Sequence, residues 1–240
     1  MGNSVLQTIL VTGSAQGLGA NIIEKFAKNG YNVIITYKSS KNKAIILEDK
    51  IRKYNLNVIS VKCDITKISD IRNLIKVVKS RFNNIEVLVN NASLSLDSSF
   101  ENKSKEEFMK VLETNIYGTF LITRELIKKY KVEKVINISS TDSIDTYSDL
   151  NIDYSLSKCG INFMTKFFSN KYKDIKFYNI LPNWINTETI QNMNSEYLES
   201  ELRRVNQNKL IEPEYISNII YEMATTCKYD DNNEIRIDGD

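Results

Sequence analysis

The feature that most constrains the fold is a regular alternation of two kinds of segment. Short runs rich in Val, Ile and Thr are separated by longer stretches whose apolar residues recur every three or four positions. Buried parallel strands consist of nearly continuous apolar runs, whereas a spacing of three and four indicates one face of a helix. The predicted strands are residues 8–11, 33–36, 58–61, 87–89, 135–138 and 177–180.

Strands that alternate with helices predict an α/β fold, in which a single doubly wound parallel sheet carries helices on both faces. The chain has 240 residues, of which 42% are hydrophobic, and no linker or internal repeat is visible. We therefore expect one domain over residues 1–240. The polar stretch 187–209 is the least strand-like part and is predicted to be a mobile lid over a substrate.

The composition excludes several kinds of partner. The 32 Lys and Arg nearly balance the 30 Asp and Glu, so we expect neither nucleic acid nor membrane binding, but a small-molecule partner. The three cysteines are far apart and histidine is absent, so neither a metal site nor a disulfide framework is predicted. Residues 1–4 lack the pattern of a signal peptide and no apolar run is long enough to span a membrane, which predicts a cytoplasmic protein.

A glycine-rich turn directly follows the first predicted strand and opens a predicted helix. Glycine lets the backbone approach a pyrophosphate, and the N–H groups at a helix start favour its negative charge. An ordinary turn would explain three glycines alone, but the first strand-to-helix turn of an α/β sheet is where a dinucleotide binds. The residues predicted to contact it are Gly13, Ser14, Gln16, Gly17, Leu18 and Gly19.

The end of the second strand bears on which dinucleotide is bound. NAD-binding domains usually place an acid there for the ribose hydroxyls, whereas this chain has Tyr37, Lys38 and Ser39. A cation beside hydroxyl groups suits a 2′-phosphate, so NADP(H) is favoured and NAD(H) stays possible. The alternative is that Lys38 is an ordinary solvated charge.

Tyr154 and Lys158 are four residues apart in a predicted helix, so both side chains can enter one cleft. A nearby cation stabilises a phenolate, so we expect Lys158 to lower the pKa of Tyr154 and to let it give and take a proton. Upstream, Ser139, Ser140 and Thr141 follow the strand 135–138 at the edge where ligands bind in open α/β sheets.

Four separated motifs together resemble the short-chain dehydrogenase/reductase family along nearly the whole chain. They are the turn 12–19, Asn90-Asn91-Ala92, Asn115-Ile116-Tyr117-Gly118, and Ser140 with the Tyr154 and Lys158 pair. The resemblance implies a Rossmann fold and an NAD(P)-dependent oxidoreductase that interconverts a carbonyl and a secondary alcohol. It also implies a homo-oligomer, a tetramer or dimer, built through the helices around 115–129 and 154–170. The final 236–239 resembles the last strand of the family.

The resemblance also implies residue roles. Tyr154 would protonate the alkoxide, Ser140 would bind the substrate oxygen, Lys158 would hold the nicotinamide ribose, and Asn115 would hold a proton-relay water. The further cofactor contacts that it implies are Asp64 and Ile65 beside the adenine, Asn91 as a support, and Ile185 and Thr187 at the carboxamide.

Four positions depart from the family pattern. Ser93 and Asn183 replace expected glycines, and Asn183 is predicted to preserve its turn because Asn tolerates a positive φ. Ser140 lies one residue farther from Tyr154 than is common, so Thr141 is the alternative hydroxyl, although we favour Ser140. Gln16 stands where many NADPH users carry arginine, which weakens the NADPH prediction without reversing it.

The predicted pocket segments 94–100, 143–152 and 184–197 mix polar and apolar side chains and specify no single substrate. The sequence between the second predicted strand and the helix after it resembles that of the 3-oxoacyl-[acyl-carrier-protein] reductases, which favours a 3-oxoacyl thioester. Two alternatives stay open: an NAD-dependent sugar or polyol dehydrogenase of the same fold, and a non-catalytic NAD(P)-sensing protein.

Overall fold

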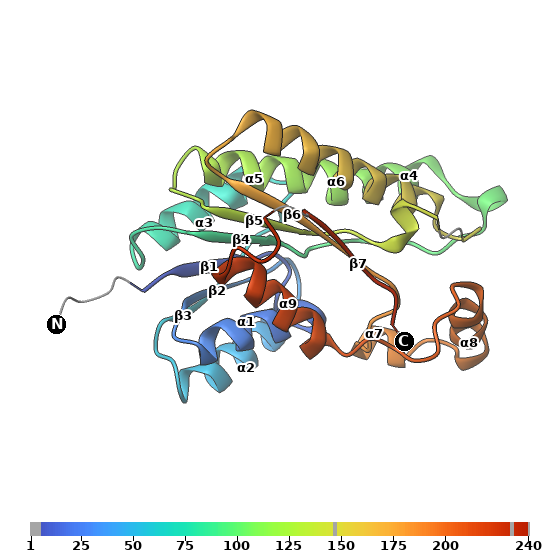
Figure 1. The fold of residues 1–240 in the computed structure, drawn as a ribbon, viewed down its shortest axis with the longest axis horizontal. Helices are drawn as coiled ribbons and strands as arrows, with labels where there is room; N and C mark the ends of the chain where they lie inside the picture. The colour runs from blue at the N-terminus through green and yellow to red at the C-terminus, as the bar shows by residue number, and fades with distance from the viewer. Residues whose placement is uncertain (1–5, 146–147, 231–232, 240) are drawn as a thin grey trace.

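One twisted sheet of parallel strands lies between two layers of helices (Figure 1). The computed structural model describes residues 6–145, 148–230 and 233–239. Residues 146–147 of the predicted pocket and the N-terminal residues 1–4 therefore lie outside the described ranges. The strands are β1 (Thr8–Val11), β2 (Asn32–Tyr37), β3 (Val58–Lys62), β4 (Val87–Asn90), β5 (Lys134–Ile138), β6 (Lys176–Pro182) and β7 (Glu234–Ile237).

The strand order is β3-β2-β1-β4-β5-β6-β7, and every pairing is parallel. The chain moves outward from β1 to β3, then returns to pair β4 with the other edge of β1. Parallel strands need long crossovers, which the helices supply. The doubly wound α/β prediction is confirmed, the bounds of β1 are as predicted, and β2 to β6 extend the predicted strands by one or two residues at their ends.

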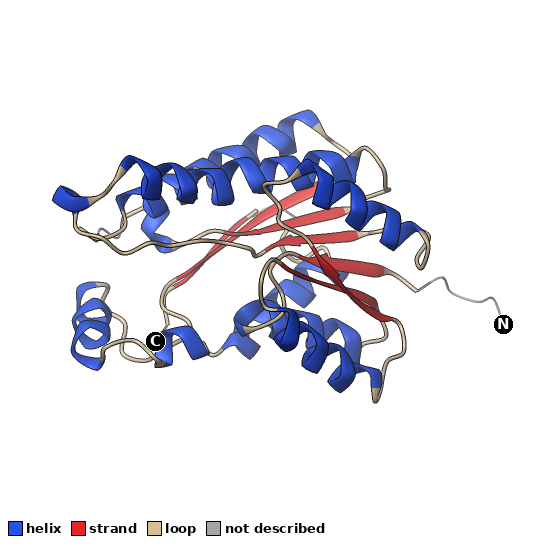
Figure 2. Cartoon of the chain, turned by 180° about the vertical axis from the view of Figure 1, so that it is seen from behind, coloured by secondary structure: helices blue, strands red, loops and turns tan. Residues whose placement is uncertain are grey.

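Side chains alternate along the strands, so each helical layer has its own core. Ile9 and Val11 face the layer of α1 (Gly17–Lys28), α2 (Lys41–Arg52) and α9 (Pro213–Thr225). Leu10 faces the layer of α3 (Ile68–Lys79), α5 (Thr119–Ile127) and α6 (Ile152–Lys171). Figure 2 shows the sheet between these layers from behind.

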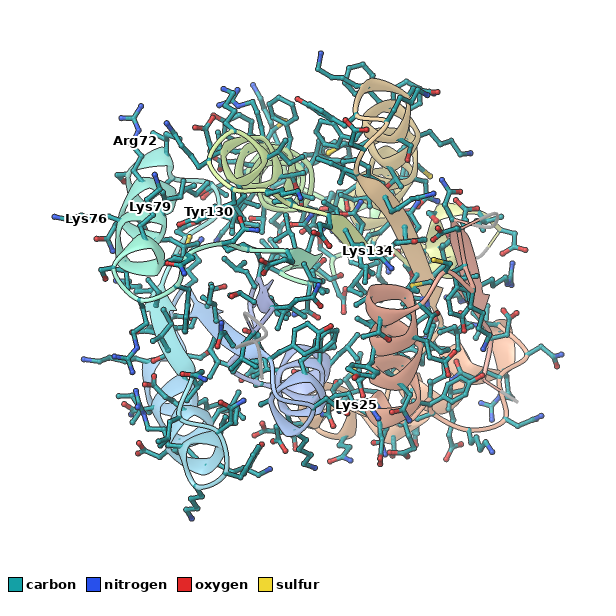
Figure 3. All side chains as sticks on the ribbon, turned by 60° about the vertical axis from the view of Figure 1, so that its left-hand side comes forward. Lys25, Arg72, Lys76, Lys79, Tyr130 and Lys134 are labelled. Carbon is teal, nitrogen blue, oxygen red and sulfur yellow. The ribbon has the colours of Figure 1, made fainter. Side chains whose placement is uncertain are left out.

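Polar contacts at the amino ends of the strands fix the helices on both faces. Lys134, at the start of β5, donates from Nζ to the carbonyl oxygens of Met223 and Thr226, at 2.8 Å each, and so satisfies the last turn of α9 (Figure 3). Tyr130, which follows α5, donates its hydroxyl to the Ile75 carbonyl of α3 at 3.0 Å (Figure 3).

A row of asparagines crosses the middle of the sheet, because Asn90, Asn137 and Asn179 are paired in register on β4, β5 and β6. Asn90 Nδ2 donates to Asn137 Oδ1 at 2.8 Å and to Thr123 of α5 at 2.9 Å. Thr165 of α6 accepts from Asn137 at 2.7 Å and donates to Asn179 at 2.6 Å. Buried polar groups need partners, so this row ties α5 and α6 to fixed places on the sheet.

Three short helical pieces and three helices complete the carboxyl-end side in the described ranges. They are η1 (Phe100–Asn102), α4 (Lys105–Leu112), the π-helical η2 (Glu113–Gly118), η3 (Thr141–Ser143), α7 (Glu188–Gln191) and α8 (Ser195–Arg204). The predicted lid 187–209 thus carries α7 and α8, which Figures 1 and 2 show apart from the two helical layers. The last strand, β7, begins two residues before the segment expected from the resemblance. No helix in the described ranges is long and apolar enough to cross a membrane.

Candidate functional site

The glycine turn between β1 and α1 adopts the backbone that its glycines permit. Gly13 and Gly17 have φ of +60° and +57°, a region that L side chains rarely adopt. A Cβ on Gly19 would lie 2.7 Å from Asn91 Nδ2 and 2.8 Å from Ser14 Cα. The third glycine therefore lets the helix start pack against the turn and the end of β4.

The turn is held from β4 and from β2. Thr12 Oγ1 accepts from the backbone N–H groups of Asn91 and Ala92, at 2.9 Å each, and Asn91 Nδ2 donates to Thr12 O at 2.9 Å and Gly13 O at 3.2 Å. Thr36 Oγ1 accepts from the Gly13 N–H at 3.1 Å. Asn91 therefore braces the turn by donating to the backbone carbonyls of Thr12 and Gly13.

The start of α1 is suited to an anion. Gln16 precedes the helix without a side-chain capping bond, and the first turn of the helix contains no acidic residue. Leu18 is buried, so at this position the backbone N–H is the group that can face a ligand. The helix dipole places partial positive charge here, which favours a pyrophosphate.

The predicted adenine-side residues meet at the ends of β2 and β3. Lys38 Nζ lies 2.9 Å from Asp64 Oδ2, and the Lys38 side chain is 61% exposed. Burial alone would raise the pKa of Asp64, but hydrogen bonds from Lys38 and Thr66 hold it below its usual range. Ser39 is exposed beside Lys38, and Tyr37 is half-buried at the end of β2.

Ile65 follows β3, whereas Ile185 and Thr187 follow β6. Ile65 packs against Gly118, where a Cβ would lie 2.7 Å from Ile65 Cγ1. Ile185 forms an isolated bridge with Ile211, and Thr187 Cγ2 lies 3.6 Å from where a Cβ on Gly17 would stand. The chain after β6 thus returns to the glycine turn, where Thr187 lies beside Gly17.

Tyr154 and Lys158 project from the first turns of α6 into one polar cluster. Lys158 Nζ lies 5.2 Å from the centre of the Tyr154 ring and donates to the Ile138 carbonyl at 2.8 Å. Burial raises the pKa of Tyr154, the charge of Asp142 adds to this rise, and a hydrogen bond from Ser140 opposes it. The expectation that Lys158 lowers the pKa of Tyr154 is wrong as a net effect, because desolvation of the phenolate dominates.

Lys158 is itself perturbed. Its side chain is buried, and desolvation lowers its pKa to about 8 although Asp142 acts in the opposite direction. A buried ammonium loses hydration, and here the Ile138 carbonyl replaces only part of it. Lys158 therefore titrates close to neutral pH.

Ser140 and Thr141 leave the end of β5 in different directions. Ser140 Oγ accepts from the Asp142 N–H at 3.2 Å and hydrogen-bonds with the Tyr154 hydroxyl. Thr141 instead donates to Asn183 Oδ1. Ser140 is thus the hydroxyl beside Tyr154, and Thr141 is committed elsewhere.

Asn183 does not preserve its turn in the predicted way. In the described ranges the one non-glycine residue with positive φ is Asn206, so the positive-φ interpretation of Asn183 is wrong. Its backbone N–H donates to Ile237 O at 2.9 Å, and its side chain accepts from Thr141. Asn183 acts through its amide, as a link between β5, β6 and β7.

Asn115 lies in the π-helical segment η2 with all its side-chain groups engaged. Its Oδ1 accepts from the Leu94 N–H at 2.8 Å, and its Nδ2 donates to Leu94 O and to Ser157 Oγ at 2.9 Å each. Ser157 Oγ in turn donates to Tyr154 O at 2.6 Å. Asn115 therefore connects the loop after β4 to the helix that carries Tyr154.

Two residues that act on Tyr154 were missed by sequence reasoning. Ser93 hydrogen-bonds with the Tyr154 hydroxyl, although it was noted only as a departure from glycine. Asp142 affects both Tyr154 and Lys158 through its charge. The position of Ser93 next to Ala92 was a usable signal, whereas the placement of Asp142 depends on how the chain turns after β5.

Two cavities elsewhere in the molecule are lined by residues other than those of the site. One of about 270 Å³ lies at the amino ends of the strands, lined by residues that include Thr8, Asn32 and Glu86. Another of about 440 Å³ lies beside Asn206 and Arg236. Across the described part of the chain, no three His, Cys, Asp or Glu side chains gather to hold a metal ion.

Known proteins resemble this chain over most of its length. The sequence profile of the family described as short chain dehydrogenase matches residues 7–198. Glucose 1-dehydrogenase 2 of Bacillus subtilis is 29% identical over 219 residues, covering 88% of this chain and 84% of the relative. The 3-oxoacyl-[acyl-carrier-protein] reductase FabG of Aquifex aeolicus is 26% identical over 236 residues, covering 96% and 95%.

A solved structure, that of the angucycline C-6 ketoreductase LanV with bound NADP, superimposes with a TM-score of 0.87. It is 21% identical, and the match covers 98% of this chain and 95% of that one. At this identity the likeness establishes the shared fold.

The burial of Lys158 predicts a pH dependence of stability. Between its native pKa of about 8 and its ordinary 10.5, the unfolded chain binds a proton that the native protein has lost, so the free energy of unfolding rises with pH. Lys158→Met cannot titrate. We expect wild type to gain about 2–3 kcal/mol relative to the variant from pH 7.5 to 10, measured by urea unfolding. Parallel curves would contradict the buried amine.

Proposed function

Because this chain belongs to the short-chain dehydrogenase family, we propose that it interconverts a carbonyl and a secondary alcohol by hydride transfer with an NAD(P)(H) cofactor. The observation that carries the proposal is the meeting of Tyr154, Ser140 and Lys158 at the carboxyl edge of the sheet. This edge is also where the glycine turn leaves β1, beside the point at which the strand order reverses. Ligands bind at such switch points in open α/β sheets.

The described residues fit a dinucleotide. Gly13 and Gly17 supply the positive φ of the turn, no side chain fits at Gly19, and the start of α1 offers uncapped N–H groups for the phosphates. Gly13, Ser14, Gln16, Gly17, Leu18 and Gly19 would hold the pyrophosphate, and Ile185 and Thr187 would border the nicotinamide. When bound, the nicotinamide supplies or accepts the hydride.

The protein side of the reaction is a proton transfer. Tyr154 donates its hydroxyl proton to the substrate oxygen during reduction, while Ser140 hydrogen-bonds the same oxygen. The Tyr154 phenol is protonated at neutral pH and so has the proton to give in carbonyl reduction, although the burial that raises its pKa makes that proton harder to donate. Asn115 has its side chain engaged, so its main-chain carbonyl would hold the relay water.

Removal of the Tyr154 hydroxyl tests this assignment. In Tyr154→Phe we expect kcat to fall by about 10²–10⁴-fold, because general acid help is lost, while cofactor affinity changes little. The single tryptophan, Trp184, provides a fluorescence signal for titration with NADPH or NADH. Turnover should be followed at 340 nm with acetoacetyl-CoA and a panel of ketones. Undiminished turnover in the variant would exclude Tyr154 as the acid.

The substrate class separates three candidate functions. A 3-oxoacyl thioester is our leading candidate, and the FabG relative supports it. A sugar or polyol dehydrogenase is the second, favoured by the similarity to a glucose 1-dehydrogenase. Cofactor binding without turnover of any panel member would favour the NAD(P)-sensing alternative. The cytoplasmic location stays a prediction from the sequence.

We propose NADP(H) as the preferred cofactor, held at its 2′-phosphate by Lys38 and Ser39. LanV, which shares the fold, was solved with NADP bound. In Lys38→Asp we expect NADPH affinity to fall by about tenfold or more, because a charge-assisted hydrogen bond to phosphate is replaced by repulsion. NADH affinity should change much less. The matched control is the exposed Lys53→Asp, and tighter NADH than NADPH binding by wild type would contradict the proposal.

We also propose a homo-oligomer, a tetramer or dimer, that pairs η2, α5 and α6 with a second copy. The Phe163 and Phe167 side chains of α6 are 72% and 52% exposed, and Tyr117 of η2 is 47% exposed. Exposed apolar patches on a folded surface indicate an interaction site.

A charge placed in that patch tests the assembly. We expect Phe163→Glu to reduce the mass measured by light scattering to that of the monomer or of a smaller oligomer, because the carboxylate would be desolvated at the interface. Leu56→Glu is the control, since Leu56 is equally exposed at 72% on another surface. A monomeric wild type would contradict the proposal.

A further inference from the structure

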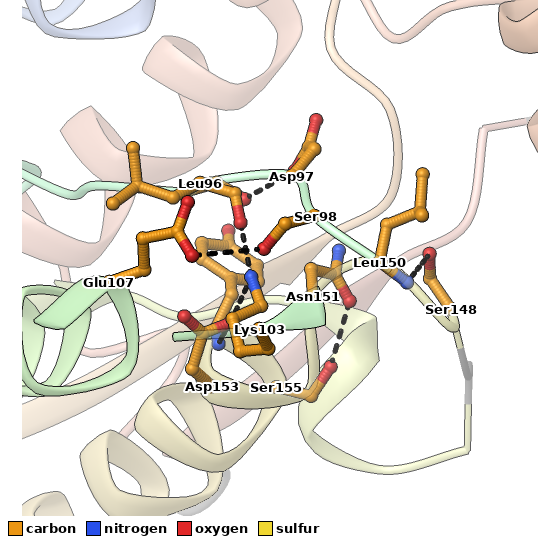
Figure 4. A network of polar contacts seen from close by, with 12 residues as sticks. Leu96, Asp97, Ser98, Lys103, Glu107, Ser148, Leu150, Asn151, Asp153 and Ser155 are labelled. Atoms are coloured by element: carbon orange, nitrogen blue, oxygen red, sulfur yellow. Dashed lines mark hydrogen bonds and ion pairs between the residues drawn. The ribbon is translucent and has the colours of Figure 1, made fainter. Parts of the chain in front are cut away.

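A buried ion pair lies directly beside Tyr154. Lys103 precedes α4, Asp153 belongs to the first turn of α6, and Nζ and Oδ1 are 3.2 Å apart (Figure 4). Their side chains are only 4% and 0% exposed. Neither residue belongs to the motifs that the sequence singled out.

Each member of the pair also contacts the backbone of the site. Lys103 Nζ donates to the Leu96 carbonyl, in the segment that follows β4 (Figure 4). Asp153 Oδ1 accepts from the backbone N–H of Tyr154 at 3.0 Å. The pair therefore joins one wall of the predicted substrate pocket to the residue that carries the reacting hydroxyl.

Alternate residues of the segment 94–98 are fixed in this way. Leu94 is bonded by Asn115 through both its N–H and its carbonyl, Leu96 by Lys103, and the Ser98 N–H donates to Leu150 O at 3.2 Å. Ser95 and Asp97, which lie between these residues, and Ser93, which precedes Leu94, are exposed.

Two of these exposed residues act on Tyr154. Ser93 hydrogen-bonds its hydroxyl, and the charge of Asp97 reaches it. Leu94, Leu96 and Ser98 are therefore bonded to neighbouring elements, whereas the residues that alternate with them include the two that act on Tyr154.

Stability alone does not explain the pair. A buried ion pair is often no more stabilising than apolar residues of similar volume, because both ions lose their hydration. Within the described ranges, Asp153 Oδ2 makes no hydrogen bond, so the burial of this carboxylate is incompletely offset. Because desolvation of the two ions is costly and the pair lies beside Tyr154, the pair is better explained by a positioning role than by a stabilising one.

We propose that Lys103 and Asp153 are positioning residues, which clamp the segment 94–98 against α6 so that Ser93 and the pocket wall meet the Tyr154 hydroxyl. The proposal rests on the proposed function for the role of Tyr154. Its structural part, the clamp, concerns residues 94–98 alone.

The test removes both charges together. Lys103→Met with Asp153→Asn leaves no unpaired buried charge, so this double variant is expected to fold, whereas Asp153→Asn alone leaves a buried ammonium and is expected to lower Tm. In the double variant we expect kcat with acetoacetyl-CoA, or with any ketone that wild type reduces, to fall at least tenfold. NADPH affinity from Trp184 fluorescence should stay within twofold, and Lys103→Arg, which keeps both charges, should retain more turnover than the double variant.

Hydrogen exchange at residues 94–98 provides a readout that needs no substrate. We expect faster exchange there in the double variant, with little change in β1 or α1. Lys105→Met and Asp149→Asn, which remove exposed charges nearby, are the matched controls. Unchanged exchange at 94–98, or turnover within twofold of wild type, would overturn the proposal. If the wild-type protein turned over no substrate, the proposed function would be wrong. Hydrogen exchange at residues 94–98 would still show whether the clamp exists.

Discussion

The whole site depends on the reversal of strand order between β1 and β4. Parallel strands on either side of that point send their following loops to opposite faces of the sheet, so the carboxyl ends of β1 and β4 are left open. The glycine turn enters this opening from one side, and Asn91 braces it from the other. Every further residue of the site is placed relative to this pair of strand ends.

Buried polar side chains hold the helices of the site in fixed positions on the sheet. The in-register row of Asn90, Asn137 and Asn179 binds α5 and α6 through threonines, and Asn115 binds Ser157 next to Tyr154. Apolar packing tolerates small shifts of a helix, whereas a buried hydrogen bond that shifts leaves an expensive unpaired group. A helix that must present a hydroxyl at one place gains from such contacts.

The electrostatics of the site favour a protonated phenol beside an amine that titrates near neutral pH. Burial produces both shifts, because it disfavours the charged form of each group. The hydroxyls of Ser140 and Ser93 act against burial at Tyr154. Ser93 illustrates how a departure from a family pattern can add a contact to Tyr154, since the glycine expected there would offer no hydroxyl.

The amino-acid sequence by itself determined the alternation of strands and helices, the glycine turn, and the four-residue spacing of Tyr154 and Lys158. These features are local, because they depend on periodicity within one segment or on the conformations open to one residue. Only the tertiary structure decided the net pKa of Tyr154, the choice between Ser140 and Thr141, the amide role of Asn183, and the pairing of Lys103 with Asp153. Each of these depends on desolvation and on contacts between residues distant in the chain, which no local pattern records.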